Sequence, residues 1–483
     1  MTFCATNHYN TNMRSFRVRN ADMNMTEGPL FGKIASVALP LAVSGILQLL
    51  FNAADLVIIG KFSQTSTVSL AAVSSNSALI GLVINVAIGL SLGANVALGQ
   101  AMGRGDREGA ERALHSAMAL SVLCGLVTAL VGCCFAGVFL RWMQTDAAVI
   151  DKATVYLRIY FAGCPANVIY NFGVSVLRAK GDTRRPLFYL ALAGILNVGL
   201  NLLLVIFAKM DVAGVALATV ISQYLSCVLT VLALLREKGY CRLILKKLHF
   251  HKAETLQILR IGLPSGILNS FFSIANVLIQ SNVNTFGAQL IAGSATANSI
   301  EGFIIAGMNA VGNASVTFAG QNYGARRFDR IGRVIGICVA LEWVVCLAGT
   351  CLFLALGRFF LGLYTNDPMV VAFAYNRLWV TIPLYCICGT CEVFAGGMRG
   401  MGHAVKPMMS NFFCICVFRI IWVNTVCRPW HIPELLYLSW PYSWVINVVS
   451  SGILYGLTLH QERGKEFAVE PLDLEEPPEP TAA

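Results

Sequence analysis

Twelve long apolar segments dominate this chain of 483 residues and limit what it can fold into more than any other feature. An α-helix needs about 20 mainly apolar residues to cross a bilayer, and each segment is long enough. Lipid offers no partner to unpaired backbone groups, so we expect helices rather than open strands. The segments are 33–60, 68–99, 113–140, 153–178, 187–209, 213–236, 258–284, 291–318, 333–360, 371–398, 406–427 and 433–460. The predicted fold class is therefore an all-α polytopic membrane protein with twelve transmembrane helices.

The composition excludes other classes. Hydrophobic residues make up 56% of the chain and charged residues only 12%, against about 25% charged in soluble domains. The net charge of +10 would suit nucleic-acid binding, but Lys and Arg also fix membrane topology, and we predict no nucleic-acid partner. Most of the 16 cysteines lie inside apolar segments, without zinc-finger spacing. We therefore predict neither a metal site of that kind nor a disulfide framework.

The positive charges predict the orientation. Of the 35 Lys and Arg residues, 26 fall in the two tails and the even-numbered loops, six in the odd-numbered loops and three inside spans. Positive loops stay in the cytoplasm. Both termini are therefore predicted to be cytoplasmic.

The two halves of the chain repeat one another at an offset of 221 to 224 residues. Six helices per repeat give both halves the same orientation, which is typical of transporters whose lobes rock about a central cavity. The matched stretches are Ala38-Leu39-Pro40 with Gly262-Leu263-Pro264, Asn52 with Asn276, Asn76-Ser77 with Asn298-Ser299, Gly99-Gln100-Ala101-Met102-Gly103 with Gly320-Gln321-Asn322-Tyr323-Gly324, Leu177-Arg178-Ala179-Lys180-Gly181 with Met398-Arg399-Gly400-Met401-Gly402, and Pro186 with Pro407.

Spans, charges and repeat together divide the chain into five parts. They are a cytoplasmic N-terminal tail (1–28), an N-lobe (29–236), a basic cytoplasmic linker (237–257), a C-lobe (258–460) and an acidic, proline-rich tail (461–483). The last part is predicted to be disordered.

Asp55 is the strongest candidate among the acids inside predicted spans. An ionised side chain at mid-membrane costs at least about 2.5–3.5 kcal/mol, so such a residue is a functional candidate by default. Gln48, Asn52 and Asp55 lie at i, i+4 and i+7 on one helical face. This stripe suits a proton, a sodium ion or an organic cation. The alternative is that Asp55 only pairs with another helix.

A second polar stripe lies on the fifth predicted helix, where Asn197 and Asn201 are one turn apart. Thr219 on the sixth helix could supply a further oxygen ligand. Asn in a membrane helix also serves as an interhelical contact, which remains the alternative.

Acids in the second half of the chain are candidates for a second coupling or substrate site. Glu301 and Glu392 either serve that role or pair structurally with Arg377 or Arg419. The complete set of candidate substrate contacts is Gln48, Asn52, Asn171, Glu301 and Glu392.

Three other charged positions are interpreted as structural. Glu342, next to Trp343, is predicted to be structural or interfacial. Arg158 and Arg377 are equivalent in the repeat and are predicted to extend to the lipid headgroups from the outer ends of their spans.

No enzyme or nucleotide-binding signature is present. The chain has no HExxH sequence, no P-loop and no nucleophile elbow, and none of its seven His residues pairs with Ser or Cys at a useful spacing. Transport would therefore use an ion gradient rather than ATP, with no cofactor apart from H+ or Na+ as the coupling ion.

The N-terminal half carries motifs that resemble a known family. They are Thr26-Glu27-Gly28-Pro29-Leu30, Leu39-Pro40, Gln48-Leu49-Leu50-Phe51-Asn52-Ala53-Ala54-Asp55 with Gly60, Ala71-Ala72-Val73, Gly99-Gln100 with Gly103, Leu177-Arg178-Ala179-Lys180-Gly181-Asp182-Thr183, and Gly214-Val215-Ala216-Leu217-Ala218-Thr219. The chain strongly resembles the multidrug and toxic compound extrusion (MATE) family, on its bacterial DinF-like side, over about residues 25–460.

The resemblance implies a V-shaped pair of six-helix lobes in the bacterial inner membrane, exporting amphipathic cations in exchange for protons or sodium. It implies that Asp55 is the coupling acid, accompanied by a polar cluster of Asn197, Asn201 and Thr219 that could hold Na+. Position 201 often carries a second aspartate in the family, and this chain has Asn there. The choice between proton and sodium therefore stays open.

Three functions are compatible with the sequence to different degrees. The leading hypothesis is a secondary antiporter, acting as a monomer, that exports cationic drugs or toxic metabolites. The alternative is a flippase for a lipid-linked oligosaccharide precursor, which a basic cavity would favour. A membrane-embedded enzyme is the third, and it lacks a catalytic cluster.

Overall fold

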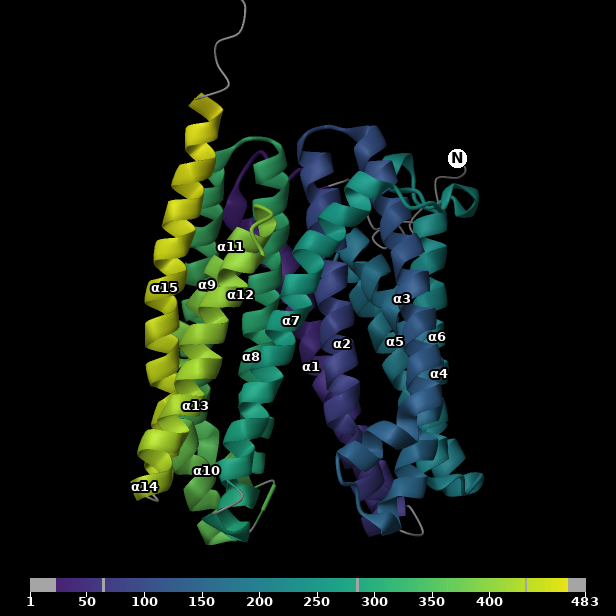
Figure 1. Cartoon of the computed structure of the whole chain (residues 1–483), viewed down its shortest axis with the longest axis vertical. Coiled ribbons are helices and arrows are strands. Elements are labelled where there is room, and N and C mark those ends of the chain that lie inside the picture. Colours follow the sequence, from purple (N-terminus) through teal and green to yellow (C-terminus); the bar gives the residue numbers. More distant parts are fainter. Residues whose placement is uncertain are drawn as a thin grey trace, which may run out of the picture.

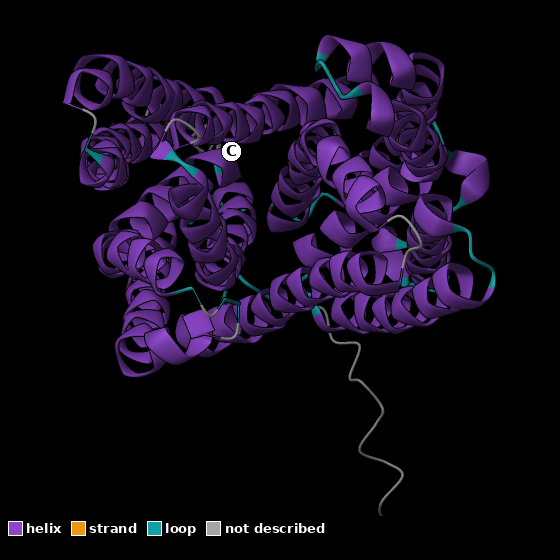
Figure 2. Cartoon of the chain, turned by 90° about the horizontal axis from the view of Figure 1, so that it is seen from below, coloured by secondary structure: helices purple, strands orange, loops and turns teal. Residues whose placement is uncertain are grey.

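A computed structural model describes residues 23–62, 66–283, 286–362, 364–365, 367–430 and 432–467. These residues form helices joined by short turns, and none of them lies in a β-strand (Figure 2). The all-α class predicted from the apolar segments is confirmed.

The first half of the chain forms one lobe. Its helices are α1 (Leu30–Phe62), α2 (Ser66–Gly103), α3 (Arg107–Trp142), α4 (Ala147–Ala179), α5 (Arg184–Asn201), which continues as a π-helix η1 (Leu202–Phe207), and α6 (Asp211–Leu235). Two short 3-10 turns, η2 (Gly239–Cys241) and η3 (Leu245–Lys247), follow in the predicted linker.

The second half forms the other lobe (Figure 1). Its helices are α7 (Lys252–Val283), α8 (Ala288–Gly324), α9 (Phe328–Gly362), α10 (Pro368–Thr381), η5 (Ile382–Leu384), α11 (Tyr385–Gly400), α12 (Val405–Asn411), η6 (Phe412–Val417), α13 (Phe418–Trp422), η7 (Val423–Cys427), α14 (Arg428–Trp430) and α15 (Pro433–Phe467). The stretches from α10 to α11 and from α12 to η7 each make one crossing, interrupted by 3-10 or π turns.

Eleven stretches in the described part of the chain are long and apolar enough to cross a membrane. The twelfth predicted span corresponds to α4, which is a helix of 33 residues that packs against α3 and α6 but is less apolar. Several helices extend beyond their predicted spans, and two of them cross a predicted boundary between parts of the chain. The helix α7 begins at Lys252, inside the predicted linker, and α15 continues to Phe467, beyond the predicted end at 460.

The two lobes approach each other at the end where α1 begins and α15 ends, and they diverge toward the opposite end (Figure 1). The repeated Gly-Gln-x-x-Gly motifs of α2 and α8 meet at the close end. A Cβ atom at Gly103 would lie 2.0 Å from the carbonyl oxygen of Gln321, and one at Gly324 would lie 2.1 Å from that of Gln100. Gln100 Nε2 also donates across the lobes to the carbonyl oxygen of Gly400, at 2.8 Å. The motif therefore allows close contact between the two lobes.

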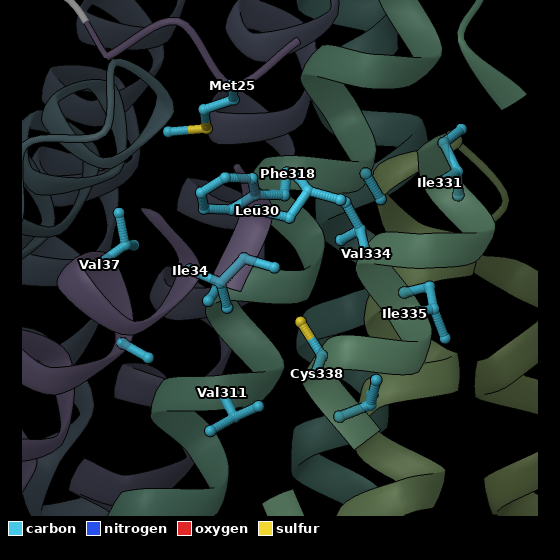
Figure 3. Close-up of a cluster of buried hydrophobic side chains, with 14 of the residues drawn as sticks. Met25, Leu30, Ile34, Val37, Val311, Phe318, Ile331, Val334, Ile335 and Cys338 are labelled. Carbon is cyan, nitrogen blue, oxygen red and sulfur yellow. The ribbon is translucent and has the colours of Figure 1, made fainter. Parts of the chain in front are cut away.

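One apolar cluster joins the start of α1 to the second lobe (Figure 3). Ile34 and Val37 of α1 pack there with Phe318 of α8 and Ile335 of α9. Met25, just before α1, is fully buried in the same cluster. The first turns of α1 are thus anchored on the C-lobe, while Phe51 and Asp55 further along the helix contact α5 of the N-lobe.

Candidate functional site: a polar cluster in the N-lobe

Asp55 lies in the second half of α1 and contacts the end of α5. Asn201 Nδ2 donates a hydrogen bond of 2.5 Å to Asp55 Oδ1 and is 3.2 Å from Asn197 Oδ1. Asn197 Nδ2 in turn approaches Thr219 Oγ1 of α6, at 3.5 Å. The structure therefore brings together the four residues that the sequence grouped, Asp55, Asn197, Asn201 and Thr219, in one connected line across three helices.

Burial and charge distinguish this cluster. Asn201 is completely buried and Asn197 is 6% exposed. Asp55 takes part in no ion pair with Lys or Arg within the described ranges. A carboxylate without a basic partner at membrane depth needs a proton or a bound cation to neutralise it. The cluster offers carboxylate, amide and hydroxyl oxygens for that purpose.

The backbone changes at this cluster. Helix α5 passes into the π-helix η1 immediately after Asn201. Such π segments are rare and occur often at functional sites. The sequence gives no direct signal for this change, because the apolar run Leu202–Phe207 is compatible with an ordinary helix.

The other N-lobe candidates lie outside this line of hydrogen bonds. Gln48 and Asn52 are exposed on α1 and lie on the same helical face as Asp55. Asn171 on α4 donates to the backbone oxygen and to Oδ1 of Asn167, at 2.9 and 3.0 Å.

Glu301 of the C-lobe forms a buried ion pair. Its Oε2 accepts from Arg377 Nη2 at 2.7 Å, and its Oε1 accepts from Thr381 Oγ1 at 2.8 Å. Arg377 is 3% exposed and also donates to Asn298 Oδ1. The prediction that Arg377 extends to the headgroups is therefore wrong, because its guanidinium is held inside the lobe by Glu301.

Glu392 has a different partner from those predicted. Its Oε1 accepts a hydrogen bond of 2.5 Å from Nη2 of Arg399, which lies seven residues further along α11. Its side chain remains 31% exposed. Neither Glu301 nor Glu392 pairs with Arg419.

Glu342 is the most deeply buried acid. It is 0% exposed on α9, so the interfacial interpretation is wrong. Cys346 Sγ lies 3.6 Å from its Oε1, and its Oε2 has no hydrogen-bond partner. Gly389 of α11 makes room for the carboxyl group, since a Cβ there would lie 2.1 Å from Oε1. The adjacent Trp343 is 46% exposed and faces outward, whereas Glu342 faces inward, so the two neighbours do not share an environment.

Two six-helix lobes, one of which holds a partly buried acid without a basic partner, define a polytopic membrane transporter. The family model described as MatE matches residues 40–203 and 264–423, so the chain belongs to the MatE family, as its motifs predicted. The chain is therefore a transporter and not an enzyme.

Curated relatives and solved structures agree with this assignment. The chain is 27% identical over 383 residues to "Probable multidrug resistance protein YoeA" of Bacillus subtilis, covering 78% of this chain and 82% of the relative. It is 25% identical over 408 residues to "DNA damage-inducible protein F" of Escherichia coli, covering 83% and 87%. An outward-facing structure of a multidrug resistance MATE family transporter superposes with a TM-score of 0.85 at 20% identity, covering 92% of this chain and 99% of that one.

Proposed function

We propose that this transporter is an antiporter that exports amphipathic organic cations in exchange for H+ or Na+. The observation that carries the proposal is the contact between Asp55 and the buried Asn201 in a cluster without Lys or Arg. The relatives named for multidrug resistance support small-molecule export as the general activity. They do not favour the flippase alternative.

The proposed cycle uses the ion as a switch for α1. An ion enters the N-lobe from outside and neutralises Asp55, which rearranges its hydrogen bond with Asn201. The later turns of α1 then repack, with Pro40 as the bending point, because its missing N–H leaves a gap in the helical hydrogen bonding. This closes the site that holds the drug and releases it outward. Both termini lie in the cytoplasm in this scheme, as the positive loops indicate, and a monomer contains the complete cluster.

Export of a fluorescent organic cation from everted vesicles tests the proposal. Wild type, Asp55→Asn and the control Asp151→Asn are compared under an imposed proton gradient and then a sodium gradient. Asp151 is exposed on α4, so its replacement changes the same chemical group at an unrelated place. We expect export under one gradient, lost in Asp55→Asn and kept in Asp151→Asn. Export that survives in Asp55→Asn would move coupling elsewhere, and no export by wild type under either gradient would contradict cation antiport.

A further inference from the structure

The C-lobe contains a pocket between α7 and the crossing formed by α13 and η7. It is a small cavity of about 70 Å³ that opens partly to solvent. Ala275, Ile279 and Asn282 of α7 line one side, and Arg419, Val423 and Asn424 line the other. The walls are thus mainly apolar, with one guanidinium and amide groups, and this combination of side chains is the one that lines small-molecule sites.

Arg419 is the unusual residue of this pocket. It is 1% exposed, yet its partners are all neutral. Its Nε donates to Ser443 Oγ at 3.2 Å and its Nη1 to Asn276 Oδ1 at 3.4 Å, while Nη2 has no hydrogen-bond partner. The guanidinium also lies over the rings of Phe272 and Trp440, at 5.6 and 5.8 Å. A buried positive charge with an unsatisfied donor is costly, so it needs a reason to be there.

No carboxylate of the described residues neutralises Arg419. The titratable side chains that act on it electrostatically are Tyr385, Cys388, Cys416 and the cation Arg377. The nearby acids are already occupied, Glu301 by Arg377 and Glu392 by Arg399. No acid among the described residues is therefore left to neutralise Arg419, and an anionic ligand could supply the negative charge.

The internal repeat relates this pocket to the Asp55 cluster, but the two sites differ in charge: one contains a carboxyl group and the other a guanidinium. The offset of 224 that relates Asn52 to Asn276 also relates Asp55 to Ile279. The offset of 221 that relates Pro186 to Pro407 relates the start of η1 at Leu202 to the start of η7 at Val423.

Each lobe therefore has a π-helix at the same position of the repeat. It lies beside the first helix of its lobe, which is α1 in the N-lobe and α7 in the C-lobe. The acid occurs on α1 in the N-lobe, whereas the C-lobe has an apolar residue in its place and a guanidinium on α13. Arg419 is the equivalent of Val198, next to Asn197.

We propose that the pocket at Arg419 binds an anionic group, a carboxylate or phosphate, carried by an amphipathic substrate. This rests on the proposed transport function and narrows its substrate class to organic cations that also carry a negative group, that is, to zwitterions. The free Nη2 donates to the anion, and Asn282 and Asn424 lie on the pocket wall as further polar groups. The apolar side chains of Ala275 and Val423 contact the ring or chain of the same compound.

Equilibrium binding of a matched pair of dyes tests the site without any ion gradient. Tetramethylrhodamine carries a carboxylate, and its methyl ester is the same cation without one. Both are titrated by fluorescence anisotropy against the full chain in nanodiscs of zwitterionic lipid. The proteins are wild type, Arg419→Gln, Arg419→Lys and the control Arg358→Gln, an exposed arginine of the same lobe.

We expect Arg419→Gln to weaken binding of the carboxylate dye by about tenfold or more, as for loss of a charge-assisted hydrogen bond. Binding of the ester should change less than about twofold, Arg419→Lys should retain part of the preference, and Arg358→Gln should match wild type. Ile420→Trp is a further variant that keeps Arg419. It should disturb the fold little, because Ile420 is 44% exposed at the pocket edge. It should also weaken binding of the carboxylate dye by filling the pocket.

The outcomes separate the alternatives. The proposal would be overturned if Arg419→Gln weakened binding of both dyes equally, or if wild type bound the carboxylate dye no more tightly than the ester. Competition by phosphatidylglycerol in the nanodisc, seen in wild type and lost in Arg419→Gln, would support the anion site and identify a lipid headgroup as its occupant. Failure of gradient-driven cation export would contradict antiport and leave this binding result unaffected, so the two failures are distinguishable.

Discussion

Asn201 Nδ2 donates a hydrogen bond to Asp55 Oδ1 across 2.5 Å, which joins α1 to α5 where α5 becomes a π-helix. The Oδ1 of the same Asn201 is buried without a partner. A proton on Asp55 would create an O–H donor beside this free acceptor, and an amide can rotate to exchange its donor for its acceptor. The pair can therefore keep a hydrogen bond in both charge states of Asp55, with its direction reversed.

The variant Asn201→Asp tests the charge balance of this pair. Two carboxylates in contact cannot both be ionised unless a cation lies between them. We expect transport by Asn201→Asp to become stimulated by Na+ several-fold more than wild type, measured as dye export at fixed pH with and without sodium. The matched variant Asn171→Asp, away from the cluster, should show no such gain. An unchanged sodium response in Asn201→Asp would contradict a cation site at this place.

The ion pair between Glu301 and Arg377 predicts a large effect on stability. Glu301→Gln leaves Arg377 buried and unpaired, and breaking such a pair costs about 3–5 kcal/mol. The double variant Glu301→Leu with Arg377→Met should recover most of this loss, because both charges are then removed. Thermal unfolding in detergent measures both.

Asp329→Asn provides the control for this prediction. Asp329 is 90% exposed in its pair with Arg463, and its loss should cost less than about 1 kcal/mol. If Glu301→Gln were as stable as wild type but failed to bind substrate, the substrate role predicted from the sequence would be favoured instead.

The sequence predicted the parts of this molecule that depend on local pattern. The apolar runs gave the helices, and the one-turn spacing of Asn197 and Asn201 placed both on the face of α5 that meets Asp55. The sequence does not determine which charged residues pair when they lie far apart along the chain. Glu301 and Arg377 are 76 residues apart, and their contact depends on how α8 packs on α10.

The sequence also does not show whether a side chain points into the lobe or away from it. Glu342 and Trp343 are neighbours in sequence, and only the packing of α9 on α11 shows that the acid points inward. The charge of Arg419 was visible, but its lack of an acidic partner follows from where all other acids lie in three dimensions. The π-helices have no residue signature in these apolar stretches.

The contact between the lobes at Gly324 predicts sensitivity to a single methyl group. In Gly324→Ala the new Cβ would lie 2.1 Å from the carbonyl oxygen of Gln100, so the lobes must move apart. Overpacking of this kind costs about 1–3 kcal/mol. We expect a lower melting temperature, whereas Gly336→Ala on α9, where a Cβ meets nothing within 4 Å, should be neutral or stabilising. Equal melting temperatures for both variants would show that the lobes do not pack this closely.

Glu237, between α6 and α7, predicts a pH-dependent contribution to stability. Burial alone would raise its pKa, but hydrogen bonds and charge from Lys180 and Arg185 outweigh burial and hold the pKa of Glu237 below its ordinary value of 4.5. A group with a lowered folded-state pKa stabilises the fold above its unfolded pKa, and this stabilisation is lost as pH falls through the folded value.

Glu237→Gln should therefore destabilise the protein by about 3 kcal/mol at neutral pH, because two cations lose their partner in a site that is 6% exposed. The difference from wild type should stay constant down to about pH 5.5 and shrink below about pH 4.5. Thermal unfolding in detergent across this range measures it, with Glu108→Gln as the control, since Glu108 is 90% exposed in its pair with Arg112. A difference between wild type and Glu237→Gln that does not shrink below about pH 4 would mean that the Glu237 charge does not stabilise this loop.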